Sequence, residues 1–359
     1  MTDYKLFPRR KTRQIRIGEV LVGGGAPISV QSMTKTDTRN VRATVAQIRR
    51  LERAGCEIVR LAVPDAAAAA ALGVIRKKSR LPIVADIHFD HRLALKSIDA
   101  GADGLRINPG NIGSAAKVRE VVRAAAVRGI PIRIGVNAGS LEKDLLRAGV
   151  GVTAEAMAAS AVRHIRMFED LGFFAIKVSL KASDIPRTLE AYRLLAARVD
   201  YPFHAGITEA GGLEAGGVKS AAGLALLIRE GLADTIRVSL TAPPESEVRT
   251  AWGILRSLGL RARGIDIVSC PTCGRCEVDL IKIAAAVERK LAGFEEPLTV
   301  AVMGCMVNGP GEARETDFGV ACGRGTGVLF RKGRVVRKVR EDGIVEALTE
   351  EIMKERKKA

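Results

Sequence analysis

The chain has 359 residues, of which 47% are hydrophobic and 27% charged, so it is long enough to bury a large core. A barrel of eight parallel strands takes about 250 residues, which leaves room for one smaller domain. Aromatic residues make up only 4% of the chain, which is few for a protein that reads nucleic-acid bases by stacking. The net charge of +17 predicts instead a surface or site that attracts anions.

The N-terminal residues 1–11 are basic but contain no apolar segment of the kind found in signal peptides. The longest apolar run, residues 66–75, is about half as long as a membrane span. We therefore expect a cytoplasmic protein that does not enter the membrane and does not bind nucleic acid.

Short apolar segments alternate with helical patterns over the first two thirds of the chain. The helix expected first has Val45, Ile48 and Leu51 on one stripe and Asn40 as its N-cap. A glycine closes a helix before the next strand at five places: Gly55, Gly101, Gly129, Gly172 and Gly231. The eight predicted strands are 28–30, 58–63, 82–87, 104–107, 131–136, 175–178, 203–207 and 235–238.

This alternation predicts an α/β protein with a parallel sheet. Eight units predict that the sheet closes into a TIM (β/α)8 barrel within residues 1–262. An open doubly wound sheet is the alternative. The connection 137–171 is longer than the others and is expected to carry an extra helix or lid around residues 141–144.

The pattern changes after residue 262, which predicts a second, smaller α+β domain over residues 263–359. We expect a helix at 278–291, an apolar strand at 298–303 and a hairpin with its turn at Lys332-Gly333, between strands 327–331 and 334–339. A basic helix is expected to follow and to run to the C-terminus.

Five of the predicted barrel strands place one cation between two apolar residues. These cations are Arg60, Arg106, Arg133, Lys177 and Arg237. Strand side chains alternate between two faces, so the cations can share the barrel interior and ring its C-terminal mouth, where barrel active sites lie. A buried cation needs a counter-charge, and Asp86 and Glu209 supply only part of it. A bound phosphate group is the interpretation we favour over separate local ion pairs.

Two other features of the strand ends leave alternatives open. Asp86 and His88 share one face, although a single histidine is more often structural than catalytic. Lys177 at a barrel strand also permits a Schiff-base lyase.

The second domain contains four closely spaced cysteines, Cys270, Cys273, Cys276 and Cys305. This spacing, in a chain without a secretory signal, is typical of a metal site, and on spacing alone a structural zinc site with four cysteine ligands is the favoured interpretation. The glycine-rich loop 308–311 and the carboxylate Glu312 favour a site that does more than hold zinc. The remaining cysteines, Cys56 and Cys322, are expected to be packing residues.

Seven segments of the sequence resemble a known family along nearly the whole chain. The similarity is to the bacterial 4-hydroxy-3-methylbut-2-enyl diphosphate synthases of the non-mevalonate isoprenoid pathway. The segments are 27–34, 84–90, 105–113, 131–141, 206–212, 270–275 and 304–313.

The resemblance implies a TIM barrel followed by a ferredoxin- or sulfite-reductase-like domain that carries a 4Fe-4S cluster. It implies the cluster ligands Cys270, Cys273, Cys305 and Glu312. Cys276 departs from the family pattern, which leaves open whether it replaces Glu312. An oxygen ligand would leave iron more readily than a thiolate and so admit substrate.

The implied reaction is the two-electron reductive ring opening and dehydration of 2-C-methyl-D-erythritol 2,4-cyclodiphosphate, catalysed by an iron-sulfur oxidoreductase acting on CH or CH2 groups. Glu209 would be the acid/base residue. The implied partners are flavodoxin or ferredoxin as electron donor and a second copy of the chain in a homodimer. The implied substrate-binding residues are Arg60, Arg106, Arg133, Asn137, Lys177, Thr208, Arg263, Ser269 and Asn308.

Two functions from other classes remain. An RNA-associated protein with a four-cysteine zinc site would suit the positive charge but not the few aromatic residues. A Lys177 Schiff-base lyase is the other, and borohydride trapping with a carbonyl substrate would reveal it.

Overall fold

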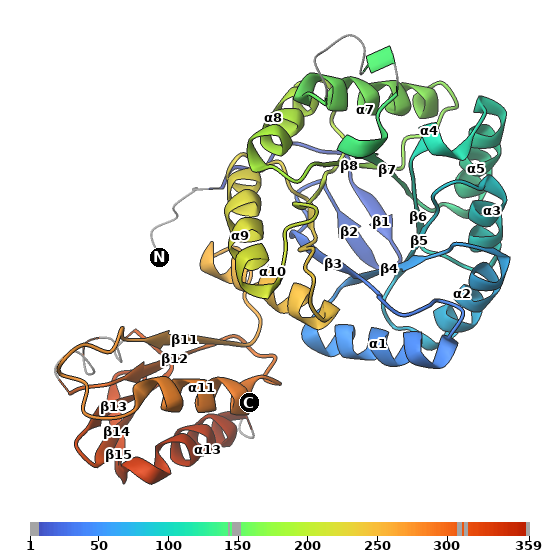
Figure 1. Ribbon diagram of the computed structural model, residues 1–359. Coiled ribbons are helices and arrows are strands. Elements are labelled where there is room, and N and C mark those ends of the chain that lie inside the picture. Colours follow the sequence, from blue (N-terminus) through green and yellow to red (C-terminus); the bar gives the residue numbers. More distant parts are fainter. Residues whose placement is uncertain (1–6, 143, 146–151, 307–310, 312–314, 357–359) are drawn as a thin grey trace. The chain divides into compact units, whose positions relative to one another are not determined.

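The computed structural model describes residues 7–142, 144–145, 152–306, 311 and 315–356. The chain forms two compact units, Met1–Arg261 and Ala262–Ala359. Each unit is a separate body with its own core, so the two are described in turn (Figure 1).

The first unit is built on eight parallel strands that form one sheet in the order β8-β7-β6-β5-β4-β3-β10-β9. A parallel bridge between Val178 and Phe203 joins the two ends of this order, which closes the sheet into a barrel. The predicted barrel is therefore confirmed, and the open doubly wound sheet is excluded. The strands are β3 (Ser29–Met33), β4 (Ile58–Ala62), β5 (Ile83–Asp86), β6 (Gly104–Ile107), β7 (Ile132–Asn137), β8 (Ile176–Lys181), β9 (His204–Ala205) and β10 (Thr235–Ile236).

Helices surround these strands on the outside of the barrel (Figure 1). In the first of them, the Asn40 side chain accepts a hydrogen bond from the Ala43 amide, and Gly55 ends the helix with φ of 96°. The other four predicted helix-ending glycines also have positive φ. The helices are α1 (Val41–Ala54), α2 (Ala66–Lys78), α3 (His91–Asp99), α4 (Pro109–Ile112), α5 (Ala115–Arg128), α7 (Ala154–Glu169), α8 (Ile185–Ala196), α9 (Leu213–Arg229) and α10 (Pro244–Ser257).

The long connection after β7 begins with a 3-10 turn, Ala138–Ser140, and ends in α7. The expected lid around residues 141–144 lies partly outside the described residues. A short hairpin that the sequence did not predict, β1 (Ile15–Ile17) and β2 (Val20–Val22), packs Ile15, Ile17 and Val22 against Ile58 and Val84. Because Ile58 and Val84 lie near the starts of their strands, this hairpin covers the N-terminal end of the barrel interior.

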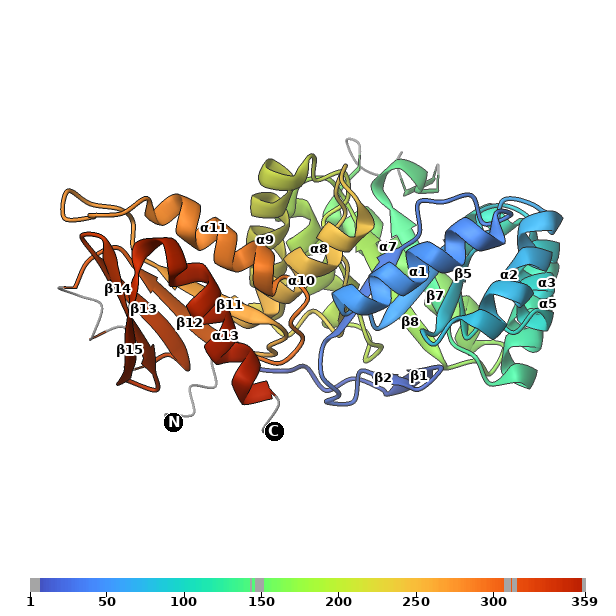
Figure 2. The same cartoon turned by 90° about the horizontal axis from the view of Figure 1, so that it is seen from below.

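The second unit is a five-stranded sheet in the order β11-β12-β13-β14-β15, parallel over its first three strands and antiparallel thereafter (Figure 2). Two helices contribute Val287, Leu291, Leu348 and Ile352 to its core. The elements are β11 (Ile265–Ser269), α11 (Leu280–Leu291), β12 (Leu298–Met303), β13 (Phe318–Gly323), β14 (Thr326–Arg331), β15 (Arg334–Arg340) and α13 (Ile344–Arg356).

The predicted helix, strand and hairpin of this unit are confirmed, whereas β11 and β13 were not predicted. The expectation of a basic C-terminal helix is wrong, because α13 has four carboxylates and only two cations: Glu346, Glu350, Glu351, Glu355, Lys354 and Arg356. None of the helices in the described part of the chain is both long and apolar enough to span a bilayer.

Candidate functional site

Three of the predicted cations lie side by side on neighbouring barrel strands. Arg106 on β6 is paired in register with Arg133 on β7, and Arg133 with Lys177 on β8. Residues paired across parallel strands point to the same face. The alternating residues, such as Ile132 and Ile134, belong to the core shared with the helices, so the cations point into the barrel.

Asp86 is the carboxylate that balances part of this charge. Its Oδ1 lies 3.1 Å from Nη1 of Arg106, and its Oδ2 lies 3.5 Å from Nε of Arg60 and 3.6 Å from Nε2 of His88. Burial alone would raise the pKa of Asp86, but Arg60, the hydrogen bond with His88 and Arg106 hold it well below its usual range. Asp86 is therefore ionised, yet one carboxylate cannot offset two guanidinium groups.

Arg133 and Lys177 are buried more deeply and have less compensation. Their exposed fractions are 3% and 2%, and none of the three guanidinium nitrogens of Arg133, nor Nζ of Lys177, has a hydrogen-bond partner among the described residues. Burial, and then the charge of Arg133, lower the pKa of Lys177 well below its usual value. A guanidinium group stays protonated in proteins, so the free site holds positive charge that lacks a counter-ion.

The position of these two residues corrects the expectation of a ring at the barrel mouth. Arg133 and Lys177 are the second residues of their strands and, with Ile15 and Ile17 of the hairpin, line a residual space of about 10 Å³. Both therefore line the covered end of the barrel. Burial, and then the charges of Arg60 and Arg106, lower the pKa of Arg133 well below its usual value, so the cations form one group that extends from this end toward the mouth, near which Asn137 ends β7.

The structure adds Lys181 to the predicted cations. It lies four residues after Lys177 on the same face of β8 and is only 8% exposed. Burial, followed by the charges of Arg60 and Arg237, lowers its pKa well below the usual value. The two-residue period that identified Lys177 could have found Lys181 as well.

The charge of Arg237, a cation that the sequence pattern did predict, is partly balanced by Glu247. Nη2 of Arg237 lies 3.7 Å from Oε2 of Glu247. The same buried carboxylate lies 3.1 Å from Nζ of Lys35 and accepts a hydrogen bond from the Ser32 hydroxyl at 3.0 Å. Glu247 is a helix residue of α10, so no strand pattern could have placed it here.

Two predicted site residues follow β9. Thr208 is half-buried and Glu209 is exposed. Glu209 has φ of 52°, in the left-handed region that side chains other than glycine rarely adopt. Such strain is maintained only where surrounding structure or function requires it, which is consistent with a special role at this end of the barrel.

Arg263 and Ser269 are not residues of the barrel unit. Both lie in the second unit, where Nη2 of Arg263 is 3.0 Å from Oε1 of Glu295 and Ser269 is the exposed last residue of β11. Asn308 and Glu312, the other predicted residues of this unit, lie outside the described residues.

The cysteines of the second unit gather at one edge of its sheet, here called the thiol edge and defined by Cys270, Cys273, Cys276 and Cys305. Cys270 follows β11 and Cys305 follows β12; these strands are parallel, so their C-terminal ends meet. The Gly304 amide donates a hydrogen bond to Sγ of Cys270 at 3.3 Å. This hydrogen bond holds the Cys270 sulfur beside the residue that follows β12.

The thiol edge has the donor chemistry of a metal centre but not yet its geometry. Cys270 and Cys305 are half-buried, while Cys273 is exposed on a turn. Within the described ranges, no three His, Cys, Asp or Glu side chains are arranged around one point as a metal requires. Cys56 and Cys322 differ from the others, because they are buried and burial raises the pKa of each thiol to about 12.

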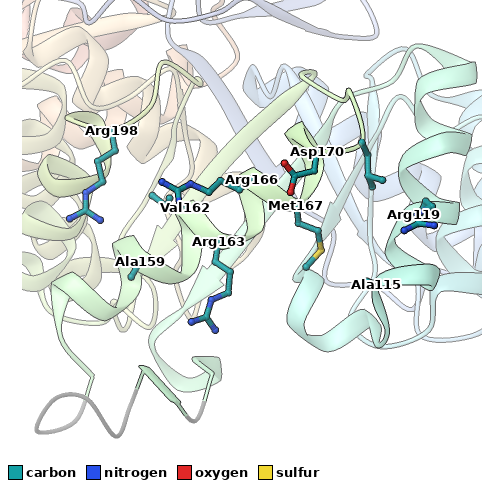
Figure 3. A pocket seen from close by; sticks show the side chains of 10 residues that line it. Ala115, Arg119, Ala159, Val162, Arg163, Arg166, Met167, Asp170 and Arg198 are labelled. Carbon is teal, nitrogen blue, oxygen red and sulfur yellow. The ribbon is translucent and has the colours of Figure 1, made fainter.

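Other hollows of the first unit lie away from these residues. Two of them, of about 620 and 790 Å³, adjoin the outer surface of α7. Figure 3 shows Arg163, Arg166 and Arg198 around the first, with their guanidinium groups spread apart rather than directed at one point. We therefore place the candidate site at the buried charges of the barrel interior and not in these surface hollows.

Two family models match the chain in succession: the GcpE TIM-barrel domain over residues 12–252 and the GcpE protein C-terminal domain over residues 266–354. Among curated relatives, the 4-hydroxy-3-methylbut-2-en-1-yl diphosphate synthase (flavodoxin) of Geobacter sulfurreducens is 61% identical, with 96% of this chain and 98% of that protein covered. The protein of the same name from Maridesulfovibrio salexigens is 60% identical, with 98% and 97% covered.

A solved structure, dihydropteroate synthase from Stenotrophomonas maltophilia, is similar in fold alone. It is 15% identical with a TM-score of 0.50, and the match covers 69% of this chain and 99% of that one. Its extent agrees with a barrel as the larger part of the chain. Together, the two family models and relatives that match nearly end to end establish that the chain belongs to the GcpE family.

Proposed function

We propose that this chain is a 4-hydroxy-3-methylbut-2-en-1-yl diphosphate synthase, an iron-sulfur oxidoreductase that takes electrons from flavodoxin. The observation that carries this proposal is the 61% identity, over 96% of the chain, to a relative of that name. The reaction is the reductive ring opening of 2-C-methyl-D-erythritol 2,4-cyclodiphosphate, which consumes two electrons and releases one hydroxyl as water. Ferredoxin is the alternative donor.

The barrel, residues 1–262, serves as the substrate domain in this proposal. A diphosphate group supplies the counter-charge that Arg133 and Lys177 lack, and Arg60 and Arg106 hold the other side of the same anion. Lys177 and Lys181 have lowered pKa values in the absence of an anion. A bound anion favours the charged amines, so it raises these pKa values and the two lysines take up protons. Lys181 and Arg237 extend the anion site, while Asn137 and Thr208 orient the substrate through hydrogen bonds.

The leaving hydroxyl needs a proton, and Glu209 is the residue that we assign to supply it. Its exposed position after β9 allows the carboxyl to exchange protons with solvent between turnovers. The buried carboxylate Asp86 is unsuited to this task, because neighbouring cations keep it ionised.

Residues 263–359 serve as the cluster domain. Cys270, Cys273, Cys305 and Glu312 would hold a 4Fe-4S cluster, which supplies electrons and an iron able to accept a substrate oxygen. The position of Cys270 and Cys305 at one sheet edge, with the Gly304 amide directed at a sulfur, supports this ligand set. Arg263, Ser269 and Asn308 would contact substrate from this domain. We also propose a homodimer and a cytoplasmic location.

The decisive experiment is turnover of the cyclic diphosphate with a chemical reductant under anaerobic conditions, together with metal content and the visible spectrum. A cluster absorbs broadly in the visible region and zinc does not. A colourless zinc protein without turnover would refute the proposal and favour the RNA-associated alternative.

The lowered pKa of Lys177 also fits a Schiff-base lyase, because a neutral amine is the nucleophile such enzymes need. Reduction with borohydride in the presence of a carbonyl substrate would trap the adduct on Lys177. Trapping without iron-dependent turnover would favour the lyase.

A further inference from the structure

Cys276 is the one thiol of the thiol edge that the proposed cluster leaves without a role. It is half-buried, and its Sγ donates a hydrogen bond to the carbonyl of Val278 at 3.2 Å. Its backbone is also anchored, since the Cys276 amide donates to the Cys273 carbonyl at 2.9 Å and so closes a turn. Cys276 is thus held in place and is not a loose surface thiol.

Gly304 brings Cys276 and Cys270 to the same point. A Cβ on Gly304 would lie 2.6 Å from Sγ of Cys276 and 3.5 Å from Sγ of Cys270. The backbone reinforces this arrangement, because the Gly304 amide donates to Cys270 and the Gly304 carbonyl accepts from the Glu277 amide at 3.3 Å. Both sulfurs therefore border the space that a side chain at residue 304 would fill, together with Cδ2 of Leu280, 3.2 Å from the same point.

We propose that Cys276 is a resolving thiol that forms a reversible disulfide with Cys270 when the cluster is absent. The inference rests on the proposed ligand role of Cys270, which leaves that thiolate unprotected once iron is lost. Cys322 and Cys56 cannot replace Cys276, because both are buried, out of reach of the oxidant, and Cys56 belongs to the other unit.

The oxidant in this step is a low-molecular-weight disulfide. The Cys270 thiolate attacks one of its sulfurs and expels one thiolate, which leaves a mixed disulfide on Cys270. The Cys276 thiolate then attacks the Cys270 sulfur and expels the second thiolate. One protein S–S bond forms and the S–S bond of the oxidant breaks; two electrons pass to the oxidant, and the two thiol protons go to the released thiolates. A dithiol reductant reverses the step, so Cys270 is kept from irreversible oxidation to sulfinic acid.

The sequence allows a direct test on the full-length chain. The anaerobically purified protein is first assayed for iron, then stripped of it by chelation, exposed to oxidised glutathione, alkylated and digested with trypsin. Cleavage after Arg263, Arg275 and Lys282 separates Cys276, on peptide 276–282, from Cys270, on peptide 264–275. We expect these two peptides to be disulfide-linked, and fragmentation between Cys270 and Cys273 to place the bond on Cys270.

Matched variants complete the experiment. Cys276→Ser should lose the linked peptides, carry glutathione on Cys270 and fail to regain iron after peroxide treatment, reduction and reconstitution, whereas the wild type regains it. Cys322→Ser and Cys56→Ser should form the linked peptides as the wild type does. Unlinked peptides in the wild type, or a bond to Cys273 or Cys305 instead of Cys270, would overturn the inference. Absence of iron in the first assay would refute the proposed function instead, and the peptide map would remain interpretable.

Discussion

The barrel interior and the thiol edge hold their chemical groups in different ways. In the barrel, Arg106, Arg133 and Lys177 extend from paired strands and are at least nine-tenths buried. At the thiol edge, Cys270 and Cys305 follow the ends of strands, and Cys273 is exposed on a turn. One region is fixed by a hydrogen-bonded sheet, and the other depends on loops.

This difference indicates what each region needs from its ligand. The barrel positions are preorganised, so an anion has only to neutralise charge that is already in place. Among the described residues the thiol edge is not arranged around one point, so the proposed cluster would have to draw its ligands together as it binds. The following experiments test this distinction.

The largest effect is expected at the thiol edge. Cys270→Ser should abolish the visible absorbance and nearly all bound iron, because a hydroxyl is a poor substitute for a thiolate ligand. Cys56→Ser is the control, since a serine hydroxyl can donate to the Ile58 carbonyl as the Cys56 thiol does at 3.1 Å. Iron per chain measures both. Normal iron in Cys270→Ser would remove the thiol edge from consideration as the metal site.

A large loss of stability is expected in the barrel when its buried carboxylate is neutralised. Asp86→Asn leaves Arg60 and Arg106 without their counter-charge, which should lower the free energy of unfolding by about 3–5 kcal/mol. Urea unfolding measures the change, and the exposed Asp99→Asn, with Arg128 4.0 Å away, should change little.

The pH dependence of the same variant supplies a second measurement. Because the pKa of Asp86 is lower in the folded state than its unfolded value of about 3.9, its contribution to stability is present above that value and is lost as the pH falls below it. The wild type should therefore lose stability more steeply in acid than Asp86→Asn. Equal slopes would mean that Asp86 is not held by the cations.

A smaller effect, of opposite signs for binding and stability, is expected at Lys177. Lys177→Met should weaken binding of the cyclic diphosphate by about 1.5–3 kcal/mol, through loss of one charged hydrogen bond, yet stabilise the free protein. Calorimetric titration and urea unfolding measure the two effects, with the exposed Lys96→Met as control. A variant that binds normally would separate Lys177 from the anion site.

The sign of the pH dependence at Lys177 follows from its lowered pKa. Between that folded value and the unfolded value of about 10.4, only the unfolded state carries the proton, so the stability of the wild type rises with pH over this interval. Lys177→Met should lack this rise. An identical pH profile for variant and wild type would show that the amine is not buried without a partner.

The sequence predicted the structure correctly where the spacing of residues along the chain repeats regularly. The two-residue alternation of strands placed Arg106, Arg133 and Lys177 on one face, and the eightfold repeat predicted the barrel. It missed β1 and β2, whose three residues are too few to show a period. It also missed β13, because both faces of Phe318–Gly323 are buried and no polar residue alternates.

The site was predicted only where its residues lie on strands. Glu247 comes from a helix and was missed. Asp86 was identified, but its pairing with Arg60 and Arg106 was not, because that pairing depends on side chains from distant parts of the chain. Arg263 and Ser269 were taken from the family resemblance, and the expected boundary after residue 262 assigned both to the second domain; the second compact unit begins at Ala262.

The smallest effect is expected at the hairpin turn of the second unit, and it tests whether the thiol edge is a local feature. Lys332 has φ of 46° and precedes Gly333, with φ of 74°, in the two-residue loop between Arg331 and Arg334. This turn joins the far ends of β14 and β15, opposite the edge where β12 and β13 end. Asparagine tolerates positive φ better than lysine, so Lys332→Asn should stabilise the unit by about 0.5 kcal/mol. Gly333→Ala should act in the opposite direction, by about 1 kcal/mol. Neither change should alter iron per chain, because the cysteine ligands lie on loops at the opposite edge of the sheet. An altered iron content with Lys332→Asn would mean that the whole sheet, and not the thiol edge alone, determines how the metal is held.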